Sequence, residues 1–174
     1  MAATYDLISS QTVNTSSVAF TDISSGYTDL ILQATFTMSA GGDAYVRFNS
    51  VSTAIYEFLG AGTQNPSGTQ IFEVVNSGGG QQQLPIVGTP NSQQQSNNPN
   101  TFELFIPSYS QDSYPKAGML NASYITDRSA PRNNTKVCAW RWDNSSVINR
   151  IDVYTSSANI VGTLNLYGIL AANA

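Results

Sequence analysis

The chain has 174 residues, with 7 basic and 11 acidic side chains, no histidine and a formal charge of −4. Without histidine neither a Ser-His-Asp nor a Cys-His catalytic system can form, and the single cysteine, Cys138, excludes an internal disulfide and a cysteine-based zinc site. Seven scattered basic residues and a pI near 4.4 argue against a nucleic-acid partner, because binding to phosphate requires a basic patch.

Apolar and polar residues alternate along most of the chain, and this period of two predicts β-strands. The clearest case is residues 28–38, where five apolar residues between Leu30 and Met38 alternate with mainly polar ones. No window of twelve residues has the spacing of a helix, so we expect essentially no helix. In chain order, the predicted strands are 28–38, 44–49, 55–59, 71–75, 102–106, 136–142, 147–154 and 160–169, with weaker candidates at 4–8 and 18–20.

About ten strands separated by polar, glycine-containing turns predict an all-β domain. The length favours a jelly-roll-like antiparallel β-sandwich over an immunoglobulin-like domain, and another Greek-key sandwich is the alternative. A chain of this size buries roughly 70% of its unfolded surface, which suits a single domain over residues 1–174. The predicted core anchors are Leu30, Leu32, Phe36, Phe48, Trp140 and Tyr167.

Two polar segments interrupt the alternation and are predicted to be long loops. Residues 76–100 are rich in Gln, Asn and Gly, and only residues 84–87 within them could pair as a strand. This segment is either a surface loop or an arm that orders against a neighbouring chain. Residues 108–131 carry several tyrosines, which either contact a partner or pack inside the fold. The candidate partner contacts are Gln81, Gln82, Gln83, Leu84, Gln93, Gln94, Tyr109, Tyr114 and Tyr124.

The sequence offers no set of residues that specifies catalysis or a cofactor. Glycosidase chemistry needs two carboxyl groups held close together in a cleft, and nothing places any pair of the acidic residues in this way. Asp22 and Asp43 are the best isolated oxygen ligands for calcium, but ordinary turns explain both. We therefore predict no catalytic residue, no bound metal and no cofactor, and expect that the protein is not an enzyme.

Cys138, Trp140 and Trp142 share one face of the predicted strand 136–142. A cysteine that shares a strand face with two tryptophans is best explained as a small residue of the core. The alternative is that the two indole rings are exposed and stack on a sugar. Residues 1–10 lack the features of a signal peptide, and no stretch approaches 18 apolar residues, so we expect neither secretion by that route nor a membrane partner.

Short segments spread over residues 5–169 follow one another in a characteristic order. They are residues 25–32, 46–49, 59–62 and 105–109, the positions Trp142, Ile148 and Ile151, and residues 162–169, which end in Leu-Tyr-Gly-Ile. Together they resemble a family of β-sandwich virion proteins from tailed bacteriophages, including phages of cyanobacteria. The order of the segments and the terminal motif carry the resemblance.

This resemblance implies a structural part of a phage particle, made in the host cytoplasm and exposed on the exterior of the virion. Domains of this kind occur as capsid decorations and as parts of tail fibres. Strand-like residues directly after Met1 leave no room for a fibre shaft, so our first hypothesis is a capsid cement protein. It would bind the major capsid protein or other virion proteins and associate with itself as a trimer. The alternative is a tail-fibre or receptor-binding domain whose partner is a host-surface glycan.

Overall fold

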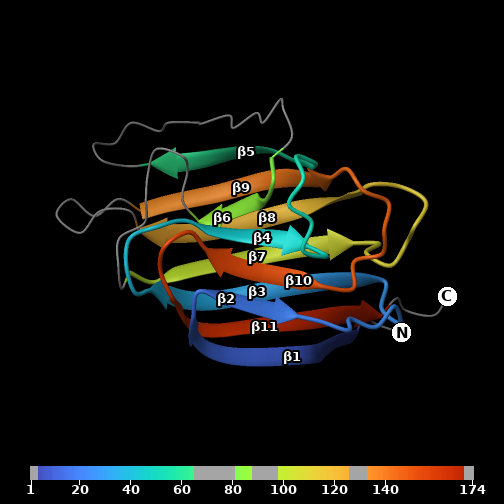
Figure 1. The fold of residues 1–174 in the computed structure, drawn as a ribbon, viewed down its shortest axis with the longest axis horizontal. Helices are drawn as coiled ribbons and strands as arrows, with labels where there is room; N and C mark the ends of the chain where they lie inside the picture. The colour runs from blue at the N-terminus through green and yellow to red at the C-terminus, as the bar shows by residue number, and fades with distance from the viewer. Residues whose placement is uncertain (1–3, 65–80, 88–97, 126–132, 171–174) are drawn as a thin grey trace.

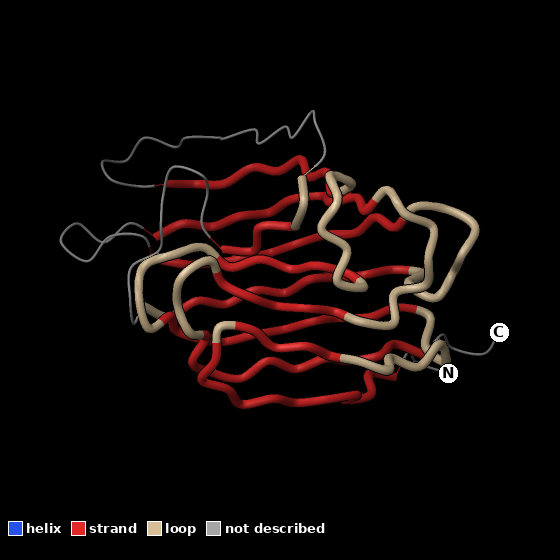
Figure 2. Tube along the Cα trace, viewed as in Figure 1, coloured by secondary structure: helices blue, strands red, loops and turns tan. Residues whose placement is uncertain are grey.

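A computed structural model describes residues 4–64, 81–87, 98–125 and 133–170. Within these ranges eleven strands form two sheets, and no helix occurs. In Figure 1 the smaller sheet lies in front of the larger one, and in Figure 2 loops at both ends of the strands connect them. The strands are β1 (Thr4–Thr15), β2 (Ser17–Phe20), β3 (Asp29–Met38), β4 (Ala44–Phe48), β5 (Tyr56–Gln64), β6 (Leu84–Val87), β7 (Asn100–Pro107), β8 (Lys116–Ile125), β9 (Asn133–Trp142), β10 (Ile151–Thr155) and β11 (Ile160–Leu170).

The larger sheet has seven strands in the order β1-β11-β3-β7-β8-β9-β5, and the smaller has four in the order β2-β10-β4-β6. All neighbouring strands are antiparallel. The predicted all-β, jelly-roll-like antiparallel β-sandwich is therefore confirmed. Alternation predicts it well because one face of each strand is buried between the sheets and the other faces outward.

The core lies between the two sheets and contains five of the six predicted anchors. The sixth, Tyr167, is only half-buried, so its assignment to the core is wrong. The inward positions of β11 belong to Leu164 and Leu166, which are fully buried. Because successive side chains of a strand point to opposite faces, Tyr167 lies on the outer face. The anchors confirmed in the core are Leu30, Leu32, Phe36, Phe48 and Trp140.

The prediction of a loop over residues 108–131 is wrong for its middle part, which forms the ten-residue strand β8. Two inward positions of β8 hold residues that hide the alternation. Lys116 is buried with its Nζ donating to the carbonyl oxygens of Tyr114 (3.1 Å) and Ser145 (3.0 Å). At Gly118 a Cβ would come within 2.7 Å of the Trp140 indole ring and 2.1 Å of the Phe105 carbonyl oxygen, so only glycine fits there.

Other strand boundaries also differ from the predictions. β10 begins at Ile151 rather than at residue 147, because a loop precedes it in which the backbone N–H groups of Asn149 and Arg150 donate to Asn49 Oδ1 (both 3.1 Å). β1 extends well beyond the predicted residues 4–8, and residues 84–87 do form a strand. The predicted strand at 71–75 lies outside the described residues.

An aromatic cluster fills the core beneath β9. The Phe48 ring centre lies 5.2 Å from that of Trp140, 5.6 Å from that of Trp142 and 6.0 Å from that of Tyr56. Both tryptophans and Cys138 are buried, which confirms the prediction that they pack in the core. The alternative, in which the two indole rings stack on a sugar, is wrong.

Candidate binding face

The predicted partner contacts do not gather on one surface. Leu84, Tyr109 and Tyr124 are buried, so their prediction as contacts is wrong. Leu84 lies at an inward position of β6 and Tyr124 at one of β8. The hydroxyl group of Tyr109 donates to the carbonyl oxygen of Ser24, which ties the loop after β7 to the turn before β3.

The remaining predicted contacts have mixed surroundings. Gln81 and Gln82 are exposed, and Gln81 also forms backbone hydrogen bonds with Tyr56 (2.6 and 2.9 Å). Gln83 is bonded within the fold, where its Oε1 accepts hydrogen bonds from side chains of the smaller sheet. Tyr114 is 48% exposed and could contact a partner. Gln93 and Gln94 lie outside the described residues.

The outer face of the seven-stranded sheet carries an unbroken row of apolar side chains, which we call the apolar row. Its members are aligned by strand register, each opposite the next on the neighbouring strand. Leu7 and Leu59, at its two ends, are more than half exposed, whereas Ile31 in the middle is shielded by its neighbours on the same face. The apolar row consists of Leu7, Tyr167, Ile31, Phe105, Met119, Ala139 and Leu59.

Two further rows run parallel to the apolar row. The next outward positions along the strands form a polar row of Asn165, Gln33, Glu103 and Asn121. Beyond it lies a hydroxyl row, in which six neighbouring strands each contribute a Thr or Ser. The hydroxyl row consists of Thr12, Thr163, Thr35, Thr101, Ser123 and Thr135.

A groove of about 660 Å³ lies between the polar row and the hydroxyl row and crosses β11, β3, β7, β8 and β9. Within the described part of the chain, the polar row contains one side-chain hydrogen bond, from Gln33 Nε2 to Glu103 Oε2 (2.8 Å). The amides of Asn121 and Asn165 therefore remain available to a ligand. Alternation predicts that these residues point outward, but the groove depends on cross-strand register, which the sequence alone does not provide.

The outer face of the four-stranded sheet is built differently, because its polar side chains bond to one another. Arg47 Nη2 donates to Gln83 Oε1 (2.8 Å), and the guanidinium carbon lies 4.6 Å from the centre of the Tyr154 ring. The Tyr45 and Tyr154 ring centres are 5.6 Å apart. Burial raises the pKa of each of these two tyrosines to about 12, so both stay protonated at neutral pH.

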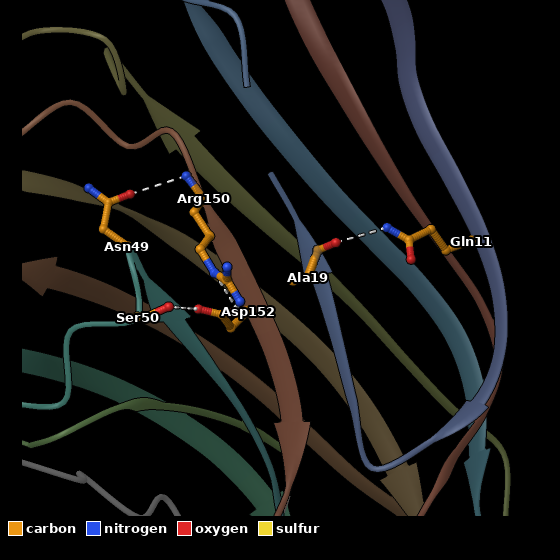
Figure 3. Close-up of polar contacts among 6 residues, drawn as sticks. All are labelled: Gln11, Ala19, Asn49, Ser50, Arg150 and Asp152. Atoms are coloured by element: carbon orange, nitrogen blue, oxygen red, sulfur yellow. Dashed lines mark hydrogen bonds and ion pairs between the residues drawn. The ribbon is translucent and has the colours of Figure 1, made fainter. Parts of the chain in front are cut away.

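A second set of bonded polar groups lies at the end of the same sheet (Figure 3). Asp152 accepts hydrogen bonds from Ser50 Oγ (2.9 Å) and Arg150 Nε (2.8 Å). Gln11 of β1 reaches across to the edge of this sheet and donates its Nε2 to the carbonyl oxygen of Ala19 (3.1 Å). These contacts tie β1 to the edge of the smaller sheet and satisfy both oxygens of the Asp152 carboxylate.

The two acidic residues considered for calcium take part in turns or local bonds. Asp22 lies in a turn with a φ angle of 56°. Asp43 Oδ2 accepts a hydrogen bond from the Tyr45 hydroxyl (3.1 Å), while its buried Oδ1 has no partner among the described residues. Burial raises the pKa of the Asp43 carboxyl above its usual value. Across the described ranges, no group of three or more acidic or cysteine side chains could hold a metal ion.

Comparisons with known proteins add no functional assignment. No protein-family model and no curated protein matches the sequence. One similar solved structure is the marine PL-14 alginate lyase from Aplysia kurodai, with 9% identity, coverage of 80% of this chain and 72% of that chain, and a TM-score of 0.29. Another is an aerolysin-like protein from Bombina maxima, with 9% identity, coverage of 90% and 91%, and a TM-score of 0.15. Among the described residues, no helix is long and apolar enough to cross a membrane.

Proposed function

We propose that this protein is a structural component of a bacteriophage virion, a capsid cement protein that binds the exterior of the assembled head and associates as a trimer. Its partners are the major capsid protein, or other virion proteins, and further copies of itself. The proposal assigns no catalytic role to any residue and no cofactor, nucleic acid or membrane partner.

The observation that carries the proposal is the edge strand β1. β1 has twelve residues and ends the seven-stranded sheet, and within the described residues it pairs with β11 on one side only. Tyr5 is 62% exposed and Leu7 is 56% exposed on its outward face. Backbone groups along such an edge can pair with a strand of another chain, and the two apolar side chains would anchor the contact.

A trimer follows from the same strand if β1 of one copy contacts a different surface of the next copy. Such a head-to-tail contact generates a closed ring when its rotation angle fits. The low content of charged side chains agrees with contacts based on shape and backbone pairing rather than on charge steering.

The test is whether the protein is present on the head and attached through β1. We expect a copy number close to that of the major capsid protein, measured by quantitative mass spectrometry of purified virions. Leu7→Lys should reduce both trimer mass in light scattering and binding to capsids lacking the protein. Met119→Lys, which also introduces a charge at an exposed apolar position but at the centre of the sheet, is the matched control. A few tens of copies confined to the tail would contradict the proposal.

The second candidate is a receptor-binding domain of the tail, and the groove on the larger sheet supports it. Immunogold labelling of virions distinguishes the two candidates, because label on the tail tip would favour the receptor-binding domain. Tyr109, Tyr124, Trp140 and Trp142 are all buried, so they provide no exposed aromatic surface for a glycan, whereas Tyr114 is 48% exposed.

A further inference from the structure

We propose that the groove between the polar row and the hydroxyl row binds an uncharged oligosaccharide. This site lies across the middle of the seven-stranded sheet, whereas the proposed virion contact lies along β1 at its edge. The two proposals are therefore independent, and a glycan could be bound by a protein attached to the head or to the tail.

The groove has the hydrogen-bonding chemistry that sugar hydroxyls require. Each hydroxyl group of a sugar both donates and accepts, and side-chain amides and hydroxyls also do both. Asn121 and Asn165 contribute amides on one side of the groove, and Thr35, Thr101 and Ser123 contribute hydroxyls on the other. A ligand with many hydroxyl groups could replace the water on both sides without leaving polar groups unpaired.

The apolar row offers a second contact surface beside the groove. Tyr167, Ile31 and Phe105 stand two residues along their strands from Asn165, Gln33 and Glu103, so they border the polar row on the side away from the hydroxyl row. Tyr167 and Phe105 are only partly buried, which leaves ring surface for contact. None of these three side chains lines the groove itself. A sugar unit that extends over the polar row would pack its apolar C–H face against Tyr167 or Phe105.

The charges at the groove favour a neutral ligand. Glu103 is the one carboxylate among its described lining residues, and it would repel uronic or sialic acids. Lys136 also lines the groove, but its Nζ donates to the carbonyl oxygen of Pro85 in the other sheet (2.7 Å) and so points away from the outer face. The whole chain is also negative, at −4.

The dimensions of the groove favour an oligosaccharide over a single sugar. It crosses five neighbouring strands, and strands lie about 4.8 Å apart, so it extends for roughly 19 Å. Its volume of about 660 Å³ is also within the usual range for ligand sites. A linear chain of several sugar rings can run across the strands with its hydroxyl groups facing both rows.

The test is calorimetric titration of the purified protein with neutral hexasaccharides of glucose, mannose, galactose and N-acetylglucosamine, and with a hexamer of uronic acid. We expect at least one neutral hexasaccharide to bind with one site per chain, and the uronic acid hexamer to bind at least tenfold more weakly. No binding of any neutral hexasaccharide, or tighter binding of the acidic one, would overturn the proposal.

Variants locate the site. Asn121→Ala should weaken binding about fivefold, the effect of losing one hydrogen bond, and Ser123→Trp should abolish it by filling the groove. Asn149→Ala, at an exposed position before β10, is the matched control and should leave affinity unchanged. Glu103→Gln should retain neutral binding and reduce discrimination against the acidic hexamer. Circular dichroism confirms that each variant is folded. Equal affinity in wild type and Ser123→Trp would show that the sugar binds elsewhere.

Leu7→Lys separates this proposal from the virion contact. It should impair association with the capsid and leave saccharide affinity unchanged, because Leu7 lies on the edge strand outside the groove lining. Loss of saccharide binding in Leu7→Lys would contradict the placement of the site.

Discussion

The two outer faces of the sandwich use polar side chains in opposite ways. On the four-stranded sheet, Arg47 bonds to Gln83 and stacks on Tyr154, so these groups hold one another in place. On the seven-stranded sheet, the polar row contains a single internal side-chain bond within the described residues, between Gln33 and Glu103. Polar groups bonded to each other contribute to the stability of the fold, whereas groups left to water are available to a ligand. This difference is the reason that we place the proposed binding site on the larger sheet.

The largest effect on stability should come from a substitution at an inward position of the larger sheet. Gly118→Ala places a methyl group against the Trp140 ring and the Phe105 carbonyl oxygen, and we expect it to lower the free energy of unfolding by about 3 kcal/mol. The neighbouring Ala117, which is exposed on the outer face, provides the control Ala117→Ser, with an expected change below about 0.5 kcal/mol. Urea unfolding measures both. If both variants changed the free energy of unfolding by similar amounts, inward and outward positions of this sheet would tolerate substitution equally, which would contradict the prediction.

Two arginines, one on each outer face, compare the faces directly. Arg47→Ala removes two hydrogen bonds, to Gln82 and Gln83, and a cation–π contact on the smaller sheet, so we expect a loss of about 1–2 kcal/mol. Arg141→Ala on the larger sheet removes ion pairs between side chains that are about half exposed, with an expected loss of about 0.5 kcal/mol or less. Thermal unfolding of the two variants at one salt concentration gives the comparison. A greater loss of stability in Arg141→Ala would contradict our inference that the polar side chains of the smaller sheet contribute more to stability.

Asp43 should make the smaller sheet sensitive to pH. Its carboxyl pKa is raised by burial above the ordinary 3.8, so the folded protein binds this proton more tightly than the unfolded chain does. The stabilisation from protonation is complete below the unfolded pKa and is lost as pH rises through the folded pKa. The free energy of unfolding of Asp43→Asn should therefore rise relative to that of wild type as the pH increases from 3 to 7. Unfolding curves at both pH values measure this, and a constant difference would show that Asp43 is not the titrating group.

The smallest effect on stability is expected from the groove itself. Asn121→Ala removes an exposed side chain of the polar row, and we expect the free energy of unfolding to change by less than about 0.5 kcal/mol. The same variant should weaken saccharide binding, so stability and binding would be separated at one residue. A loss of stability comparable to that of Arg47→Ala would mean that polar side chains stabilise the fold on both outer faces.

The sequence predicts the strands and the layer arrangement because alternation directly reflects one buried face. It fails at β8, where Lys116 and Gly118 occupy inward positions and make the pattern resemble a polar loop. In both cases the reason lies in a distant residue, since Lys116 bonds to the carbonyl oxygen of Ser145 and Gly118 makes room for Trp140. Such contacts exist only after the strands are paired.

The candidate site could be predicted less well than the fold. Exposed tyrosines and glutamines suggest contact surfaces by residue type, yet Tyr109 is buried and Gln83 is bonded to Arg47. The residues that line the groove come from five strands, and its polar members are ordinary Thr, Ser, Asn, Gln, Glu and Lys positions in the sequence. Only the register of each strand with the next aligns them, and register depends on the whole sheet.

Cys138 is a natural probe for thiol-labelling experiments that measure local opening of the larger sheet. It is the only cysteine of the chain, it is 1% exposed, and it faces Gly60 on the edge strand β5. Burial also raises the pKa of its thiol, which lowers the fraction of reactive thiolate further. A thiol reagent can therefore modify Cys138 only when the core around it opens or the domain unfolds. The rate of labelling under native conditions reports the free energy of that local opening, without any engineered probe.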